Sequence, residues 1–220
     1  MTYATAARAV ALALTIVPST TIAAQQMAHL PPLLPEQREI GLALSAGPSH
    51  VASGAAVYVL RRGGYAKVRD GSRGYSCLVE RDHPRSLAPI CYDSEASVSI
   101  LPGALRLAEL REAGFSYGEA RDSVLAMYRS GRLPVPRRPA MSYMLSAEQE
   151  LYAAPDGPRV GAWHPHVMIY SPFLTNEQIG ALPGDPSQPF VAEEGTPISH
   201  IVVITREWSR PQPAGTSHSR

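Results

Sequence analysis

Short runs of apolar residues separated by turn-forming residues dominate the segment that follows Gly54. Residues 55–60 form a continuous apolar and β-branched run, residues 65–68 alternate between apolar and polar types, and residues 75–79 are again mostly apolar. The links between them contain Arg-Arg-Gly-Gly and Asp-Gly, which are typical of tight turns between strands. The pattern therefore predicts three strands that form an antiparallel meander.

Apolar residues recur at helical spacing in three other places. Residues 36–46 end at a Gly-Pro pair and predict a short N-terminal helix. Residues 101–113 follow Ser99, which we expect to cap a second helix. A third helix begins at a capping box, in which the side chains of Ser116 and Glu119 bond each other's backbone amides. The last two helices are close in sequence, so we expect them to form a pair.

The last third of the chain returns to strand patterns. We expect strands over residues 141–145, 166–170, 190–192 and 198–205, and a second capping box predicts a short helix over residues 175–182. Strands, then helices, then strands is the order of an α+β protein. The predicted architecture is a mostly antiparallel sheet, with the helix pair packed on one face and a short N-terminal helix.

The N-terminal segment has the pattern of a secretory signal peptide. It has no acidic residue, carries the basic residue Arg8, continues with the apolar run Ala9–Val17, and then offers small residues to a peptidase. The run is too short to cross a bilayer of about 30 Å as a helix; an amphipathic leading helix is the alternative. We expect a signal peptide at 1–24, a single α+β domain at 25–208 and a disordered tail at 209–220. The predicted location is periplasmic or secreted.

Charge and composition narrow the possible partners. The 220 residues include 20 basic and 19 acidic side chains, for a formal net charge of +1. Without a basic surplus there is little to neutralise a phosphate backbone, so we expect no nucleic acid partner. No second apolar stretch approaches spanning length, so we expect no transmembrane segment after signal removal.

The chain has two cysteines, Cys77 and Cys91. An exported protein meets an oxidising compartment, where an even number of cysteines favours a disulfide. The loop closed between them is about 15 residues long, which contributes about 3 kcal/mol in the loop-entropy model. We expect the charged segment inside this loop, residues 80–85, to be exposed. A redox-active pair or a pair of metal thiolates is the alternative, although the spacing is far from C-x-x-C.

Three histidines are the best candidates for chemistry. His164 and His166 point to the same face of an extended segment, and His200 starts the last predicted strand. If that strand pairs with 166–170, the three imidazoles would converge as ligands of a zinc ion. Glu194 or Asp93 would then serve as the base that activates a zinc-bound water. The alternative is that these histidines have structural roles near strand ends.

Other patterns point less clearly to a reaction. Asp93 and Glu95 could act as a general acid and base, or could simply support the start of a helix. No G-x-S-x-G motif is present, and the glycine pairs lie between strands rather than before a helix. Tyr65, Tyr75 and Tyr170 could line a ligand cavity, or could belong to an ordinary half-buried sheet.

Several blocks of the chain resemble a group of exported bacterial proteins with a domain of unknown function. The resemblance covers most of the predicted mature chain and implies a single exported domain. It implies no activity, ligand or catalytic residue. The blocks are Gly74–Glu80, Pro89–Asp93, Tyr143–Ser146, His164–Tyr170 and Leu174–Gly180.

The sequence thus favours an exported, non-catalytic binding or envelope-associated domain with no cofactor. Its partner would be a small molecule or an envelope protein. A metal-dependent hydrolase that uses His164, His166 and His200 with zinc is one alternative. A small-ligand carrier, which would contain a deep apolar cavity, is the other.

Overall fold

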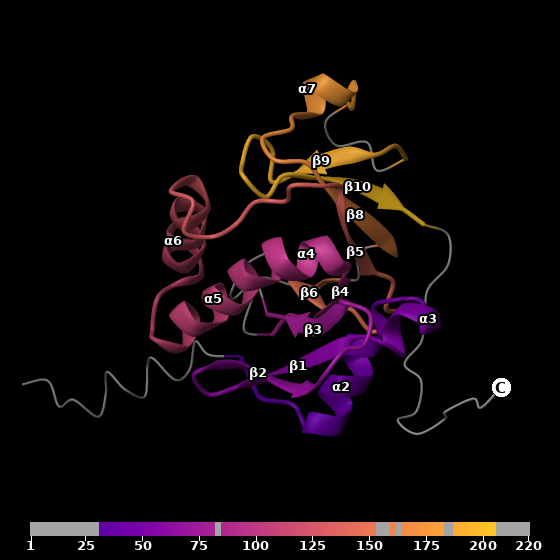
Figure 1. Cartoon of the computed structure of the whole chain (residues 1–220), viewed down its shortest axis with the longest axis vertical. Coiled ribbons are helices and arrows are strands. Elements are labelled where there is room, and N and C mark those ends of the chain that lie inside the picture. The colour runs from indigo at the N-terminus through magenta and orange to yellow at the C-terminus, as the bar shows by residue number, and fades with distance from the viewer. Residues whose placement is uncertain (1–30, 82–84, 153–158, 162–163, 183–186, 206–220) are drawn as a thin grey trace, which may run out of the picture.

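The computed structural model describes residues 31–81, 85–152, 159–161, 164–182 and 187–205. Its centre is a mixed, mostly antiparallel sheet of eight strands in the order β2-β1-β3-β4-β5-β8-β10-β9, with a separate two-stranded ribbon β6-β7 (Figure 1). The predicted α+β class is confirmed. The strands are β1 Ala56–Arg61, β2 Gly64–Arg69, β3 Ser76–Glu80, β4 Ala88–Tyr92, β5 Ala140–Met144, β6 Leu151–Tyr152, β7 Arg159–Gly161, β8 His166–Tyr170, β9 Phe190–Ala192 and β10 His200–Ile204.

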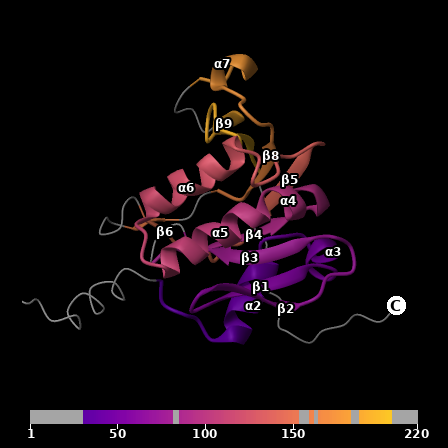
Figure 2. The ribbon, with the colours of Figure 1, turned by 60° about the vertical axis from the view of Figure 1, so that its left-hand side comes forward.

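Helices lie on both sides of the sheet (Figures 1 and 2). Alternate residues of β3 point to opposite faces, so Leu78 joins one core and Val79 the other. The core around Val79 is covered by α2, and the core around Leu78 is covered by α4 and the start of α5. The helices are α2 Glu36–Ser45, α3 Ser49–Ala52, α4 Ser94–Ser99, α5 Leu101–Glu112, α6 Tyr117–Arg129 and α7 Asn176–Ile179.

The predicted meander of the first three strands is wrong in its pairing. Strand β3 runs parallel to β1 and pairs on the side of β1 opposite to β2. After β2 the chain passes the start of β1, where Ser72 donates its backbone N–H to the carbonyl of Gly54 at 2.9 Å. Gly71 lies so close to β1 that a Cβ atom would be 2.5 Å from the backbone nitrogen of Ala56. The absence of a side chain at Gly71 therefore permits the crossing that leaves β1 paired on both edges.

The predicted helix pair is confirmed as α5 and α6, which pack against each other through a core that includes Leu110, Val124 and Tyr128. Helix α6 lies beside α5 on the side toward β9 (Figure 2). The predicted cap at Ser99 is wrong. Ser99 is the last residue of the additional helix α4, where its hydroxyl donates to the carbonyl of Glu95 at 2.6 Å.

The capping box of α6 is present, with the Ser116 hydroxyl accepting from the Glu119 amide at 3.3 Å and the Glu119 carboxylate accepting from the Ser116 amide at 2.8 Å. We expect Ser116→Ala to lower the free energy of unfolding by about 1 kcal/mol, measured by urea denaturation. Ser123→Ala is the matched control, since this hydroxyl only donates to a carbonyl one turn earlier. We expect it to change stability by less than about 0.5 kcal/mol. Equal losses in the two variants would contradict a capping role.

The predicted disulfide is confirmed, since Cys77 of β3 and Cys91 of β4 are bonded and lie directly opposite each other. The expectation of an exposed 80–85 segment is wrong at Arg81, which is buried against Glu39 because the two charges form an ion pair. Residues 82–84 lie outside the described residues, as do the predicted signal peptide 1–24 and the tail 209–220. Within the described ranges, no helix is both long and apolar enough to cross a membrane.

Candidate functional site

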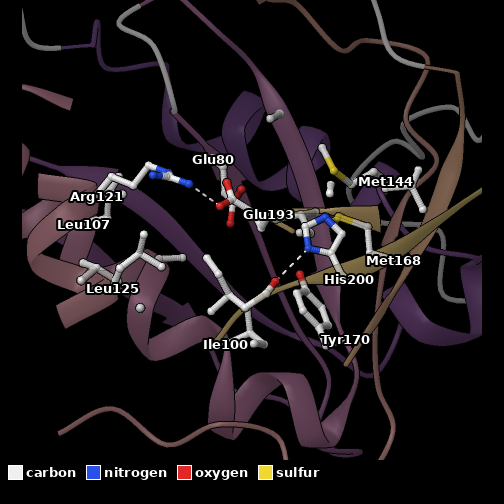
Figure 3. Close-up of a pocket in the computed structure, with 18 of the residues that line it drawn as sticks. Glu80, Ile100, Leu107, Arg121, Leu125, Met144, Met168, Tyr170, Glu193 and His200 are labelled. Carbon is white, nitrogen blue, oxygen red and sulfur yellow. Dashed lines mark hydrogen bonds and ion pairs between the residues drawn. The ribbon is translucent and has the colours of Figure 1, made fainter. Parts of the chain in front are cut away.

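A cavity of about 340 Å³ lies between the sheet and the helix pair α5 and α6 (Figure 3). Its floor comes from β3, β4, β5, β8 and β10, and its walls come from both helices and from β9. Most of the lining is aliphatic, aromatic or thioether side chains, including Ile100, Leu107, Leu125, Met144, Met168 and Phe190. The remaining lining includes a small set of polar and ionisable groups: Glu80, Tyr117, Arg121, Tyr128, His166, Tyr170, Glu193 and His200.

Strand register places the two histidines of the cavity on the same face of the sheet. On β8, His166 and Tyr170 are four residues apart and therefore point to one face. On β10, His200 lies directly opposite Tyr170, and its ring contacts that tyrosine with a centroid distance of 5.1 Å. The last strand does pair with 166–170, which was the condition for the histidines to converge.

Both imidazoles use Nδ1 in a local hydrogen bond. Nδ1 of His166 lies 2.7 Å from the carbonyl oxygen of His164, and Nδ1 of His200 lies 3.0 Å from that of Ile198. A carbonyl only accepts, so we assign the proton to Nδ1 and leave Nε2 of each neutral ring as an acceptor. Burial lowers the pKa of both histidines, while Glu193 acts in the opposite direction on His200. Both rings are therefore neutral at pH 7.

An ion pair crosses one side of the cavity. Arg121 of α6 and Glu193, which follows β9, form this pair through a guanidinium–carboxylate hydrogen bond (Figure 3). Their side chains are 34% and 27% exposed, so the pair is only partly screened by water. Glu193 adopts a left-handed backbone with φ 55°, which is uncommon for a residue with a side chain. The pair joins the helix pair to the β9–β10 end of the sheet.

Hydroxyl groups of buried tyrosines are engaged inside the protein. Tyr92 donates to the carboxylate of Glu80 beneath the cavity. Tyr128 hydrogen-bonds the carbonyls of Ser99 and Ile100 at 3.0 and 3.1 Å, and Tyr170 bonds the hydroxyl of Ser142 at 3.2 Å. Burial raises the pKa of Tyr92, Tyr128 and Tyr170, and the charge of Glu80 adds to the shift in each. These phenols therefore remain protonated.

The structure places two of the three predicted metal ligands in the lining of one cavity, four positions apart along the β8–β10 ladder. His166 and His200 line the cavity, but the side chain of His164 is exposed and is not among the lining residues. Across the described part of the chain, no group of three or more histidine, cysteine, aspartate or glutamate side chains could hold a metal ion. The zinc site with His164 stays a prediction without a convergent ligand set.

The carboxylates proposed as a base have other partners. Asp93 caps α4 by accepting from Ala96 N at 2.7 Å, and its second oxygen accepts from Met141 N at 3.0 Å. Glu194 accepts from the backbone amide of Asn176 at 2.7 Å. Both therefore stabilise local structure.

Glu95, the other member of the predicted acid–base pair, accepts from the amide of Arg137 at 2.8 Å and from the side chain of Arg138 at 3.0 Å. These bonds lower its pKa, with the Arg137 amide as the largest cause. Asp93 therefore stabilises the start of α4, and Glu95 holds the segment that leads into β5.

Only one of the three tyrosines proposed as cavity residues lines the large cavity. Tyr170 does so, whereas Tyr65 lines a separate small cavity and donates to the carbonyl of Val79 at 2.5 Å. Tyr75 packs against the core beneath α2.

Sequence reasoning missed Arg121, Glu193 and Glu80. Arg121 had a detectable signal, because it lies at helical spacing between Tyr117 and Leu125 and so places a charge inside an apolar stripe. The two glutamates had no detectable signal in the sequence. Glu193, for example, is 72 residues from its partner Arg121.

The fold and cavity define an α+β protein that has a partly open, largely apolar site with a few polar groups. Comparisons with models of protein families, with curated proteins and with solved structures found no match. The resemblance to exported bacterial proteins therefore stays a prediction.

Proposed function

We propose that this chain is an exported, non-catalytic protein that binds a small molecule in the cavity between its sheet and the α5–α6 pair. The observation that carries the proposal is the cavity itself. Its 340 Å³ volume falls within the usual range for ligand sites, and its mostly apolar lining with a few polar groups is typical of such sites. The Cys77–Cys91 disulfide is compatible with an oxidising location, either the periplasm or the cell exterior.

Binding is favoured over catalysis by the way the polar groups are used. The buried phenols and the Arg121–Glu193 pair are held in contacts within the protein. Asp93 and Glu194, the carboxylates that a hydrolase would need, are bonded to backbone amides. His200, whose Nδ1 bonds the carbonyl of Ile198, presents an acceptor atom at Nε2 that can orient a ligand within apolar walls.

A cavity-filling variant tests the proposal. Ala104 of α5 lines the cavity, so we expect Ala104→Phe to occupy its volume and to abolish binding of a neutral probe, phenethyl alcohol. Ala126→Phe is the matched control, because Ala126 lies on α6 and is exposed. Calorimetry on the purified mature protein would measure both affinities.

Two outcomes would contradict the proposal. In the first, the wild-type protein binds neither phenethyl alcohol nor any member of a panel of neutral aromatic and aliphatic probes of similar size. In the second, Ala104→Phe binds the probe as tightly as the wild type does, which would place the ligand elsewhere.

A further inference from the structure

His200 presents a hydrogen-bond acceptor to the cavity. Its Nδ1 lies 3.0 Å from the carbonyl oxygen of Ile198 and therefore carries the proton, which leaves a lone pair on Nε2. Among the described residues, no side chain or amide is hydrogen-bonded to this Nε2. The ring lines the cavity beside Tyr170, at a centroid distance of 5.1 Å (Figure 3). A ligand that satisfies Nε2 must donate a hydrogen bond.

The strand register surrounds this acceptor with apolar and aromatic side chains. His200 of β10 lies opposite Tyr170 of β8 on one side and opposite Ala192 of β9 on the other. Val202 shares the face of His200, because it is two residues further along β10, and it lies opposite Phe190. All these neighbours line the cavity. In such surroundings, a polar group that lacks a hydrogen-bond partner costs binding free energy.

The charges beside the acceptor are already paired. Glu193 directly follows Ala192 in the chain and is bonded to Arg121 of α6. An anionic ligand would compete with Glu193 for the guanidinium, and a cationic ligand would compete with Arg121 for the carboxylate. The imidazole of His200 is neutral at pH 7, because burial lowers its pKa. This end of the cavity therefore favours an uncharged polar group.

The other carboxylate of the lining is remote from this acceptor. Glu80 lies on β3, and the sheet order places β10 four strands further along. At about 4.8 Å between neighbouring strands, β3 and β10 are about 19 Å apart. Glu80 also accepts a hydrogen bond from the hydroxyl of Tyr92. Its charge therefore does not decide which group binds at His200.

We propose that the ligand is a small uncharged alcohol whose hydroxyl donates a hydrogen bond to Nε2 of His200. Its apolar body would pack against Tyr170, Phe190 and Val202, which lie around the acceptor. At about 30 Å³ for each water-sized group, the 340 Å³ cavity holds a ligand of roughly ten non-hydrogen atoms. Phenethyl alcohol is a probe of this size.

The test compares phenethyl alcohol with its isomer benzyl methyl ether, which has the same atoms but no hydroxyl proton. Calorimetry on the purified protein at pH 7 would measure both affinities, together with those of phenethylamine and phenylacetate. We expect the alcohol to bind about tenfold more tightly than the ether, because the ether leaves the acceptor without a donor. We expect both charged probes to bind more weakly than the alcohol, because burial of a charge is costly.

A variant without the acceptor locates the preference. His200→Phe keeps an aromatic ring beside Tyr170 but has no acceptor atom. We expect this variant to bind the alcohol and the ether about equally. His50→Phe is the matched control, because His50 is exposed on α3 and is not a lining residue of the cavity. It should retain the preference for the alcohol. The comparison of the probes on the wild type does not depend on the folding of either variant.

This inference rests on the proposed binding function, and the probes separate the two. Equal binding of the alcohol and the ether by the wild type would overturn the hydroxyl assignment and leave the binding function standing. An undiminished preference in folded His200→Phe, or tightest binding of a charged probe, would overturn the assignment as well. Failure of all four probes would contradict the binding function and the inference together.

Discussion

Replacing Glu39 with alanine is expected to lower the free energy of unfolding by about 3 to 5 kcal/mol, the range found when one partner of a buried ion pair is removed. Glu39 and Arg81 have side chains that are only 1% and 4% exposed, and their nearest charged atoms are 3.4 Å apart. Glu39 also accepts a hydrogen bond from the amide of Leu60 in β1 at 3.0 Å. Among the described residues, the Arg81 guanidinium nitrogens have no hydrogen-bond partner. Removal of the carboxylate therefore leaves a buried charge and a buried amide without compensation.

Glu39→Gln separates these effects. Burial raises the pKa of Glu39 more than Arg81 and the Leu60 amide lower it. Burial thus favours a neutral side chain at this position. Glutamine is neutral and still accepts the hydrogen bond from the amide of Leu60. We expect Glu39→Gln to be about 2 kcal/mol more stable than Glu39→Ala.

The pH dependence of stability provides a second measurement on the same pair. Because the pKa of Glu39 is raised in the folded state, its protonated form favours folding. That contribution is present at acid pH and is lost as the pH rises from the ordinary carboxyl value through the raised one. Glu39→Gln lacks this dependence. The difference in free energy of unfolding between the wild type and this variant should therefore decrease as the pH rises through that range.

Glu36→Ala is the matched control on the same helix. Glu36 pairs with Arg61 at 2.5 Å, but both side chains are about half exposed, so the pair is screened by solvent. We expect this variant to lose no more than about 1 kcal/mol in urea denaturation. A loss from Glu39→Ala as small as that from Glu36→Ala would contradict the assigned role of the buried pair.

The same pair shows where sequence patterns become insufficient. The helical spacing of Ile40, Ala43 and Leu44 indicates an inward face for the first helix, and Ala43 is fully buried, but Ile40 and Leu44 are only half-buried. The buried residues of α2 also include Glu39 and Leu42. A helix face that carries a glutamate is normally predicted to be exposed. Here Glu39 is buried because it pairs with Arg81, which is distant in the sequence. The rotation of α2 on the sheet could therefore not be predicted from periodicity.

Features that depend only on residues close in sequence were predicted correctly. The capping boxes at Ser116 and Thr175 are present, because a hydroxyl and a residue three positions later satisfy each other without the rest of the fold. The strand 166–170 has the predicted bounds, since alternating side chains are buried in one face. Strand β4 was missed because its segment, Ala88–Tyr92, begins with Ala-Pro. It is nevertheless buried throughout and pairs on both edges.

The candidate site is a product of tertiary packing, and so only parts of it were visible in the sequence. His166 and His200 could be predicted to share one face of the sheet if their strands paired, but the register that sets them four positions apart along the ladder could not be predicted. The Arg121–Glu193 pair could not be predicted, since it depends on the position of α6 relative to the end of β9. The cavity itself depends on the distance between two layers, which no local pattern specifies.

Loss of the disulfide is expected to have the second largest effect. We expect Cys77→Ala/Cys91→Ala to lower the free energy of unfolding by about 3 kcal/mol, because the bond closes a loop between residues 14 apart in sequence and so restricts the unfolded chain. Both cysteines are fully buried beneath α2, in the core that includes Leu42 and Val57. Alanine fits there without a polar group, so the main loss is the crosslink.

Reductant separates the crosslink from packing. Urea denaturation of the wild type with a thiol reductant should shift its midpoint down toward that of the double variant, and the variant should be unaffected by reductant. Labelling of the unfolded wild-type protein, purified from an oxidising compartment, should detect no free thiol before reduction and one at each cysteine afterwards. Free thiols in the untreated protein, together with a midpoint that reductant does not change, would contradict the crosslink. Any stability lost in the double variant would then come from core packing around β3 and β4.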